Sequence, residues 1–292
     1  MRLSSPHEKL RAGVCSFIDE EFSEIFLNDV PKKWERFDDV AILPRGSFES
    51  EKWEPYKGAR FWKMVADSLG ASRLALSGEV QGDFRRSGLI MLVGEDDRVI
   101  RRENGIDYHY RLTKCMFSAG NVNERRRMAD LTEDGEVVVD LYAGIGYYSL
   151  PILVHSRVGH VHACEWGPDA LEALRANLEA NCVGDRCTVH EGDNRVENAM
   201  ISGVADRVLL GLLPSSSEGY KSALGAIKPS GGTLHVHGLG KAGSHDDWGD
   251  CVEGEIMELS SGFVIRNRSL TKVKSHSPHW DHLVLDLSFV PA

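Results

Sequence analysis

The sequence has no long apolar run, no paired cysteine motif and no excess of basic residues. No stretch approaches the roughly 18 consecutive apolar residues that a membrane-spanning helix needs. The N-terminus, MRLSSPHEKLRAG, lacks the apolar core of a secretion signal. The six cysteines are scattered, with no Cys-x-x-Cys pair, which argues against a zinc knuckle and a disulfide framework. We therefore expect a cytoplasmic protein with reduced thiols.

Basic residues are in deficit, and the deficit is uneven along the chain. The 34 Lys and Arg residues face 44 Asp and Glu residues, for a net charge of −10. Residues 1–115 carry 19 basic and 20 acidic side chains, whereas residues 116–292 carry 15 and 24. An acidic protein binds nucleic acid only through a local basic patch. Net charge alone therefore neither identifies nor excludes a nucleic-acid partner.

Length and patterning predict two domains of different class. The 292 residues, 42% of them hydrophobic, suffice for about two globular domains at roughly 150 residues each. Residues 1–115 mix short helical and strand patterns, and Asn104-Gly105 is a strong hairpin signal. From about residue 135 onward, apolar strand patterns alternate with amphipathic helices, which is typical of βαβ units and a buried parallel sheet. We expect an α+β domain over 1–115 and an α/β domain over 116–292.

The strongest chemical signal is the glycine-rich turn that follows the first strand of the α/β domain. Residues 135–146 read GEVVVDLYAGIG, in which the apolar run ends at Asp140 and the turn contains Ala143, Gly144 and Gly146. Glycines let the backbone turn tightly and approach a ligand closely. A GxG pattern on its own is also compatible with a simple tight turn.

Acidic and amide residues end the next two predicted strands. Glu165 follows Gly146 by 19 residues, the distance at which nucleotide-binding α/β folds grip ribose hydroxyls. Asp193 and Asn194 end the third strand, where an adenine edge would lie. The alternatives are a solvated carboxylate at a helix entry for Glu165 and an N-cap for Asp193. Three such residues at successive strand ends favour a nucleotide-like ligand.

The pattern also discriminates between nucleotides. The dinucleotide fingerprint GxGxxG fails because Ser149 occupies its third glycine position, and there is no GxxxxGK[ST] phosphate loop. The pattern DxxAGxG with an acidic second strand end is that of S-adenosylmethionine-dependent transferases, whose ligand has no phosphate. The sequence therefore predicts a Rossmann-like S-adenosylmethionine-binding domain.

Longer segments resemble one particular family. TKCMFSAGNVNERRRMA (113–129), VDLYAGIGYYSLPILVH (139–155), VHACEWGPDALEALRANLEAN (161–181) and ADRVLLGLLPSSSEGY (205–220) resemble the wybutosine-synthesising tRNA aminocarboxypropyltransferases. These enzymes are relatives of the tRNA guanine-37 N1-methyltransferases. The resemblance is strong over residues 113–240, extends to segments 32–48 and 103–114, and is weak over the last 50 residues.

This resemblance implies an activity and a set of contacts. The activity is transfer of the 3-amino-3-carboxypropyl group of S-adenosylmethionine to C7 of the tricyclic precursor 4-demethylwyosine at position 37 of phenylalanine tRNA, releasing methylthioadenosine without a metal. Ser118 and Arg125 would touch the donor, Glu165 its ribose, and Asp193 and Asn194 its adenine. Without the resemblance, Ser118 reads as a turn hydroxyl and Arg125 as a solvated helix charge.

One departure separates the two branches. The resembling methyltransferases carry Asn-Pro-Pro after the fourth strand, whereas this chain has Leu213-Pro214-Ser215-Ser216. Pro214, Ser215 and Ser216 are therefore candidate substrate contacts, and the departure counts against methylation. Two alternatives stay open: a guanine-37 N1-methyltransferase, and a non-catalytic tRNA-binding protein with a degenerate donor pocket.

Two further groups of residues attract attention. His276, His279 and His282 imitate a metal cluster, but no Cys or carboxylate motif supports them, so we expect no metal. His235 and His237 share one face of an apolar strand and border either a substrate pocket or merely the strand end. Candidate tRNA contacts are Arg85, Arg86, Arg98, Arg101, Arg102, Lys114, Arg125, Arg126 and Arg127. Scattered solubilising charges are the alternative for each of them.

Overall fold

The computed structural model describes residues 5–18, 26, 28–80, 82, 86–196 and 200–292. The chain divides into two compact units. The first comprises residues 1–101 and 109–116, and the second comprises residues 102–108 and 117–292. Each unit is described below by itself.

The described residues of the first unit form a small mixed sheet and α-helices. Its elements are α1 (Pro6–Phe17), β1 (Glu35–Phe37), β2 (Val40–Leu43), η1 (Glu51–Trp53), α3 (Ala59–Ser68), β3 (Arg73–Leu76) and β4 (Ile90–Val93). The strands pair in the order β1-β2-β3-β4, and only β2 and β3 are parallel. Helix α1 begins with a capping box in which Ser5 and Glu8 bond each other's backbone N–H.

Aromatic residues dominate the core of this first unit. Phe48, Trp53 and Phe61 are fully buried, and the Phe48 ring meets the other two edge-to-face at centroid distances of 4.8 and 5.2 Å. This geometry suits aromatic rings, which prefer edge-to-face or offset contact over a face-to-face sandwich. The strands and helices of the unit therefore close around a small aromatic cluster.

The hairpin predicted at Asn104-Gly105 is confirmed. It joins β5 (Arg98–Glu103) and β6 (Ile106–Arg111), which form a two-stranded sheet. Asn104 and Gly105 have φ angles of 50° and 77°, as a type I′ turn requires at both central positions. The turn and its flanks, residues 102–108, belong to the second unit.

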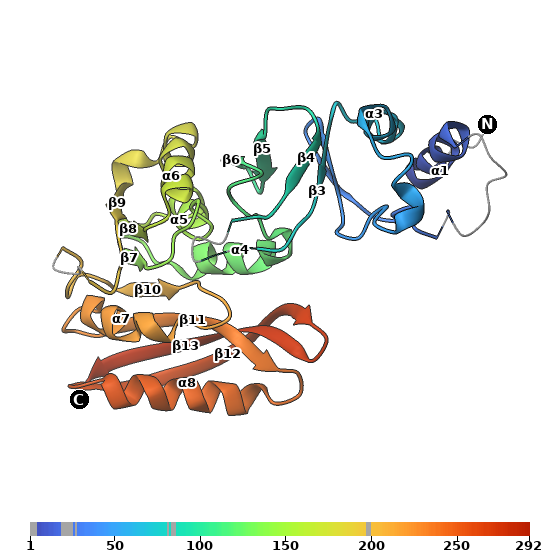
Figure 1. Cartoon of the computed structure of the whole chain (residues 1–292). Helices are drawn as coiled ribbons and strands as arrows, with labels where there is room; N and C mark the ends of the chain where they lie inside the picture. The colour runs from blue at the N-terminus through green and yellow to red at the C-terminus, as the bar shows by residue number, and fades with distance from the viewer. Residues whose placement is uncertain (1–4, 19–25, 27, 81, 83–85, 197–199) are drawn as a thin grey trace. The chain divides into compact units, whose positions relative to one another are not determined.

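The second unit is built on a seven-stranded sheet (Figure 1). Its strands are β7 (Val137–Asp140), β8 (His160–Glu165), β9 (Cys187–Glu191), β10 (Arg207–Leu210), β11 (Gly232–Lys241), β12 (Phe263–Ser277) and β13 (Trp280–Pro291). Its helices are η2 (Ala119–Asn121), α4 (Val122–Leu131), α5 (Ser149–His155), α6 (Pro168–Ala180), η3 (Gly184–Arg186), η4 (Ser217–Gly219), α7 (Tyr220–Ala226) and α8 (His245–Leu259).

The strand order β12-β13-β11-β10-β7-β8-β9 confirms the predicted α/β class. Strands β7 to β11 are parallel, and β13 runs antiparallel between β11 and β12. The chain proceeds from β7 through β8 to β9 on one side and then returns to β10 on the other. The order of the parallel strands therefore reverses between β7 and β10. In open α/β sheets, ligands bind outside the carboxyl ends of the strands at such a point.

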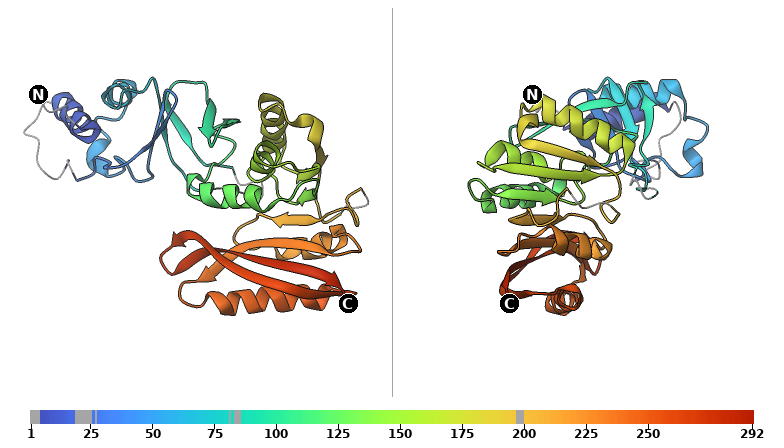
Figure 2. Two further views of the ribbon diagram at one scale, coloured as in Figure 1. Left: turned by 180° about the vertical axis from the view of Figure 1, so that it is seen from behind. Right: turned by 90° about the vertical axis from the view of Figure 1, so that its left-hand side faces the viewer.

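Helices cover both faces of this sheet. Helices α4 and α5 pack together on one face, and α7 and α8 pack together on the other (Figures 1 and 2). The core between the sheet and the second pair joins Val208, Leu234, Val252 and Ile256. The sequence did not predict α8, because its apolar residues are sparse and Gly249 and Gly254 interrupt it. No helix in the described parts of the chain is both long and apolar enough to cross a membrane.

Candidate functional site

Asp140 organises the turn at the carboxyl end of β7. It is fully buried, and its Oδ1 accepts the backbone N–H of Tyr142 at 3.2 Å while its Oδ2 accepts the Ser149 hydroxyl at 2.8 Å. Burial raises the pKa of Asp140 to about 6, against these hydrogen bonds, which lower it. Predicted as a cofactor residue, Asp140 is placed so that it ties the glycine turn to the first residue of α5.

Both glycines of the turn occupy positions that a side chain would disturb. Gly144 has φ +58° and Gly146 has φ +96°, in the left-handed region. A Cβ at Gly144 would lie 2.5 Å from the Tyr147 ring, and one at Gly146 would lie 2.8 Å from Leu150. Ala143 is buried beside them, and its N–H donates to the Cys164 carbonyl at 3.0 Å. The turn is thus a tight backbone cradle across the ends of β7 and β8.

Glu165 joins this cradle to the start of α6. Its Oε2 accepts the Gly144 N–H at 2.8 Å, and its Oε1 accepts the N–H groups of Trp166 and Gly167 at 2.9 and 2.7 Å. Burial raises the pKa of Glu165, and the three backbone N–H groups lower it. A carboxylate offers about four acceptor directions, so Oε2 keeps one for a ligand hydroxyl.

Asp193 and Asn194 both follow β9, but their side chains differ in their hydrogen-bond partners. Arg195 holds both carboxylate oxygens of Asp193, with Nε 2.9 Å from Oδ1 and Nη2 2.6 Å from Oδ2. This bonding lowers the pKa of Asp193. The guanidinium of Arg195 also lies 5.6 Å from the centre of the exposed Trp166 ring. Asp193 is therefore already occupied by a cation.

Asn194 has an open acceptor. Its Nδ2 donates to the Leu141 carbonyl, whereas its buried Oδ1 has no hydrogen-bond partner among the described residues. An unpartnered buried acceptor costs free energy unless a ligand satisfies it. At the end of β9, this amide oxygen suits an exocyclic amino group such as that of adenine. Of the two residues predicted to hold the adenine, Asn194 is the one available for it.

Arg125 is buried rather than exposed. Only 2% of it is accessible, and its Nε and Nη2 bind the two oxygens of Glu103 at 2.7 and 2.8 Å. Nη2 also donates to the Ser118 carbonyl at 3.1 Å, and the guanidinium lies 4.8 Å from the Phe117 ring centre. Arg125 lies in helix α4 and therefore stabilises the preceding loop, which carries Ser118.

The loop after β10 lies against the end of β11. The Pro214 carbonyl accepts the Leu239 N–H at 3.0 Å, and the buried Ser216 hydroxyl donates to the His237 carbonyl at 3.4 Å. Ser215 is exposed, and its hydroxyl accepts the Ser217 N–H at 3.2 Å. These contacts bring the loop and His237 together at the carboxyl ends of the parallel strands.

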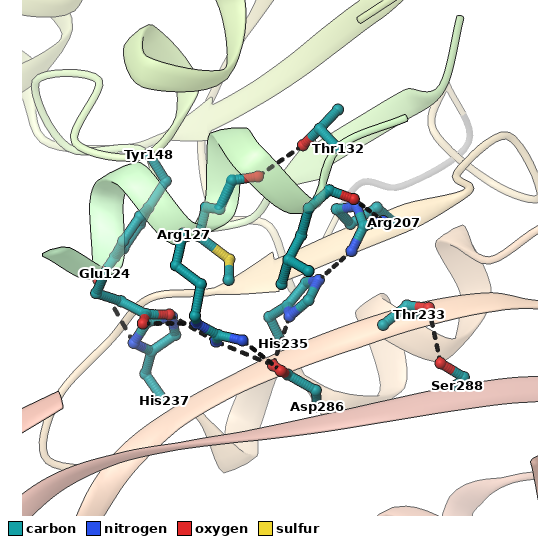
Figure 3. Close-up of polar contacts among 12 residues, drawn as sticks. Glu124, Arg127, Thr132, Tyr148, Arg207, Thr233, His235, His237, Asp286 and Ser288 are labelled. Carbon is teal, nitrogen blue, oxygen red and sulfur yellow. Dashed lines mark hydrogen bonds and ion pairs between the residues drawn. The ribbon is translucent and has the colours of Figure 1, made fainter. Parts of the chain in front are cut away.

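His235 belongs to a buried charge network below this edge (Figure 3). The Nε2 atom of His235 accepts a hydrogen bond from the Arg207 guanidinium at 2.6 Å, since a guanidinium can only donate. The proton of the His235 ring is therefore on Nδ1, which donates to Asp286 at 2.6 Å. Arg127 extends the network from α4 by pairing with Glu124 and Asp286. Burial raises the pKa of Asp286, but the bonds from His235 and Arg127 outweigh it and lower the pKa to about 2.

His237 pairs with His282, which the sequence grouped with His276 and His279. His237 Nδ1 lies 3.0 Å from His282 Nε2 and 3.4 Å from the Tyr148 hydroxyl, and both histidines are 1% exposed. Burial lowers the pKa of His237, and that of His282 to about 4, so both are neutral near pH 7. Their outer nitrogens, His237 Nε2 and His282 Nδ1, have no partner among the described residues.

The histidines of the C-terminal segment do not converge. His276 is exposed in β12, and His279 lies in the turn before β13 with φ 72°. No group of three or more His, Cys, Asp or Glu residues in the described ranges is arranged to hold a metal ion.

Comparison with known proteins decides the family. Residues 99–244 match the TRM5/TYW2 methyltransferase domain, and residues 16–97 match the TYW2 N-terminal domain. The chain belongs to the TRM5/TYW2 family. A zebrafish (Danio rerio) relative, "tRNA wybutosine-synthesizing protein 2 homolog", is 39% identical over 99% of this chain and 80% of its own length.

Other TRM5/TYW2 relatives differ in length. The Arabidopsis thaliana "tRNA wybutosine-synthesizing protein 2/3/4" is 42% identical over 97% of this chain, and the chain spans 29% of that protein. A crystal structure of Pyrococcus horikoshii TYW2 in complex with MeSAdo is 30% identical, with a TM-score of 0.79, and covers 98% of this chain and 100% of its own. The predicted Rossmann-like transferase domain, preceded by a smaller α+β domain, is thereby confirmed.

Two site features of this family member were missed in the sequence. Lys274 in β12 donates from its Nζ to the Ser118 hydroxyl at 2.8 Å, although the two residues lie at opposite ends of the unit's sequence. The pairing of His237 with His282 was also missed. Neither follows a local pattern, since each depends on how β11, β12 and β13 align.

The candidate tRNA-contacting side chains are unequally exposed. In the first unit, Arg101 pairs with Glu35 and has an exposed fraction of 16%, and Lys114 is half-buried. In the second unit, the side chain of Arg102 is 74% exposed beside Asp107. Arg126 is exposed, whereas Arg125 and Arg127 are committed to internal carboxylates. Arg85 lies outside the described residues.

Proposed function

We propose that this chain transfers the 3-amino-3-carboxypropyl group of S-adenosylmethionine to C7 of 4-demethylwyosine at position 37 of phenylalanine tRNA, releasing methylthioadenosine. The observation that carries the proposal is the similarity of nearly this whole chain to TYW2 proteins, including a solved one that holds MeSAdo (methylthioadenosine). The cradle at the end of β7 and the open acceptor of Asn194 fit the adenosine part of that donor.

The donor supplies a sulfonium, which activates its attached carbons toward displacement and needs no metal. The chain's own residues bind and orient. Gly144 and Gly146 let the backbone approach, the remaining acceptor of Glu165 suits a ribose hydroxyl, and Asn194 suits the adenine. Arg125 positions the Ser118 loop from behind. Orientation of this kind can supply about 7 to 11 kcal/mol of the barrier in well-aligned reactions.

The acceptor base would enter beside Leu213-Pro214-Ser215 and the neutral His237–His282 pair. This loop replaces the Asn-Pro-Pro of the resembling methyltransferases, which favours aminocarboxypropyl transfer over methylation. Transfer to a ring carbon forms a carbon–carbon bond and breaks the carbon–sulfur bond. The sulfur keeps the electron pair of the broken bond, and the ring carbon releases its proton to water.

A by-product assay tests the proposal. The protein is incubated with S-adenosylmethionine and tRNA that carries the precursor base, and the released nucleoside is identified by chromatography and mass spectrometry. Methylthioadenosine supports aminocarboxypropyl transfer. Release of S-adenosylhomocysteine when the acceptor is tRNA with unmodified guanosine-37 would indicate the methyltransferase alternative. Absence of both products would indicate a non-catalytic binding protein.

Compartment and tRNA identity belong to the same proposal. All six cysteines are free thiols, which favours a reducing compartment, and we propose the cytoplasm. Phenylalanine tRNA is proposed because the curated relatives are named for wybutosine synthesis. Comparing phenylalanine tRNA with another tRNA as acceptor checks the second point.

A further inference from the structure

Lys274 reaches from β12 to the loop that precedes α4. Its Nζ donates to the Ser118 hydroxyl at 2.8 Å. Its terminal carbons and Nζ run beside Gly120, where a Cβ would lie 3.1 Å from both Cδ and Nζ. In the strand register, Lys274 stands opposite His282, the partner of His237. The lysine therefore lies between the Ser118 loop and the histidine pair.

Within the described part of the chain, no carboxylate balances the charge of Lys274. Among the described residues no Asp or Glu oxygen pairs with its Nζ, although the lysine is half-buried. The neighbouring cations differ: Arg125 is bound by Glu103, and Arg127 by Glu124 and Asp286. Burial lowers the pKa of Lys274, and the nearby charge of Arg125 lowers it further. A partly desolvated, unpaired ammonium is costly unless an anion joins it.

The proposed donor carries one anionic group, the α-carboxylate at the end of the arm that is transferred. Arg125 is poorly suited to bind it, because Glu103 already neutralises the guanidinium in a two-point contact. Lys274 keeps two of its three N–H donors after bonding Ser118. An ammonium–carboxylate contact here would satisfy the unpaired charge and also hold the arm.

We propose that Lys274 binds the α-carboxylate of the aminocarboxypropyl arm, with Ser118 orienting its ammonium group. This inference rests on the proposed function, because it assumes that S-adenosylmethionine occupies the β7 cradle. The proposal assigns binding of the arm's carboxylate to strand β12, which lies in the segment where the sequence resembles the family only weakly. The adenosine part is held independently, by residues that follow β7, β8 and β9.

The test compares two ligands that differ by the arm. Calorimetry measures the affinity of the whole chain for S-adenosylmethionine and for methylthioadenosine, which has the adenosine and the sulfur but no carboxylate. Lys274→Met should weaken S-adenosylmethionine binding about ten-fold or more and change methylthioadenosine affinity less than two-fold, because only the first ligand loses a charge-assisted hydrogen bond. Lys274→Arg keeps a cation and should recover part of the loss.

Lys272→Met is the matched control. Lys272 lies two positions earlier on the same strand but is paired with Asp281, so its loss should leave both affinities unchanged. An equal loss for both ligands in Lys274→Met would mean that the lysine only supports the Ser118 loop, and no loss for either would remove it from the site. Both results overturn the inference.

The proposed function is judged separately by the nucleoside released from wild-type protein. If that is S-adenosylhomocysteine, the proposed reaction fails, while the pair of affinities still decides whether Lys274 holds the carboxylate.

Discussion

Glu165 accepts the backbone N–H of Gly144 at 2.8 Å, and this side-chain bond links the carboxyl ends of two neighbouring parallel strands. The same carboxylate also accepts the first N–H groups before α6. Glu165 therefore shapes the glycine cradle, and the proposed function gives it a second task, to bind the ribose of the donor.

Glu165→Ala should lower both donor affinity and stability. We expect S-adenosylmethionine affinity to fall about ten-fold or more, and the free energy of unfolding to fall by about 1 to 3 kcal/mol, because buried N–H groups lose their acceptor. Calorimetry and denaturant unfolding measure the two effects. Glu191→Ala is the control, since Glu191 pairs with Glu165 in the strand register but is exposed beside Arg175. Unchanged donor affinity in Glu165→Ala would remove Glu165 from the ribose site.

Exchange of the loop after β10 should separate base binding from donor binding. Replacing Leu213 and Ser215 gives Asn-Pro-Pro at 213–215, because residue 214 is already proline. We expect much slower release of methylthioadenosine and nearly unchanged donor affinity, since Pro214 and Ser216 bond the backbone of β11. Arg125→Ala should instead weaken binding of the donor, because the Ser118 loop loses its hydrogen bond from Arg125. Robust S-adenosylhomocysteine formation by the loop variant would place reaction choice in the base pocket.

Binding of tRNA to an acidic protein through a few arginines should weaken steeply with salt, because each phosphate contact releases counterions. Charge reversal at Arg101 and Arg102 should lower tRNA affinity and the salt slope without changing donor affinity. Arg102→Glu alone is the more informative variant, because both arginines are ion-paired but the Arg102 side chain is 74% exposed, whereas that of Arg101 is 16% exposed. Arg175→Glu, on α6, serves as an exposed control. If tRNA affinity does not change with salt concentration, the proposal that these arginines bind the tRNA phosphates is wrong.

The Asp286 network predicts a specific acid sensitivity. The pKa of Asp286 is about 2 in the folded chain, against about 3.9 for a free aspartate. A folded pKa below the unfolded one stabilises the protein above about pH 4, and this contribution of roughly 2 kcal/mol is lost as the pH falls toward 2. The difference in free energy of unfolding between wild type and Asp286→Asn should therefore shrink over that range.

Asp250→Asn is the comparison for this measurement. Asp250 is an exposed carboxylate paired with Arg268, and its removal should leave the acid profile unchanged. A wild-type minus Asp286→Asn difference that stays constant from pH 5 to pH 2 would contradict the role given to the buried network.

Local patterns were enough to predict much of the second unit. Apolar strand runs, the Asn104-Gly105 turn and the amphipathic stretch PDALEALRANLEAN (168–181) depend on neighbours within a few residues. The glycines at 144 and 146 are required by backbone angles that the turn itself imposes. Helix α8 escaped this reasoning, because its stability comes from packing Val252 and Ile256 onto the sheet rather than from its own sequence.

The states of the charged residues were decided by the tertiary structure alone. Arg125 stands in a run of three arginines, and nothing local shows that Glu103 buries it while Arg126 stays exposed. Asp193 is bound by Arg195, while the amide oxygen of Asn194 has no partner among the described residues. The contacts of Lys274 with Ser118 and of His237 with His282 join segments that meet only because β12, β13 and β11 align across the sheet. Local sequence sets which backbone forms, whereas burial and charge pairing depend on segments that only the completed fold brings together.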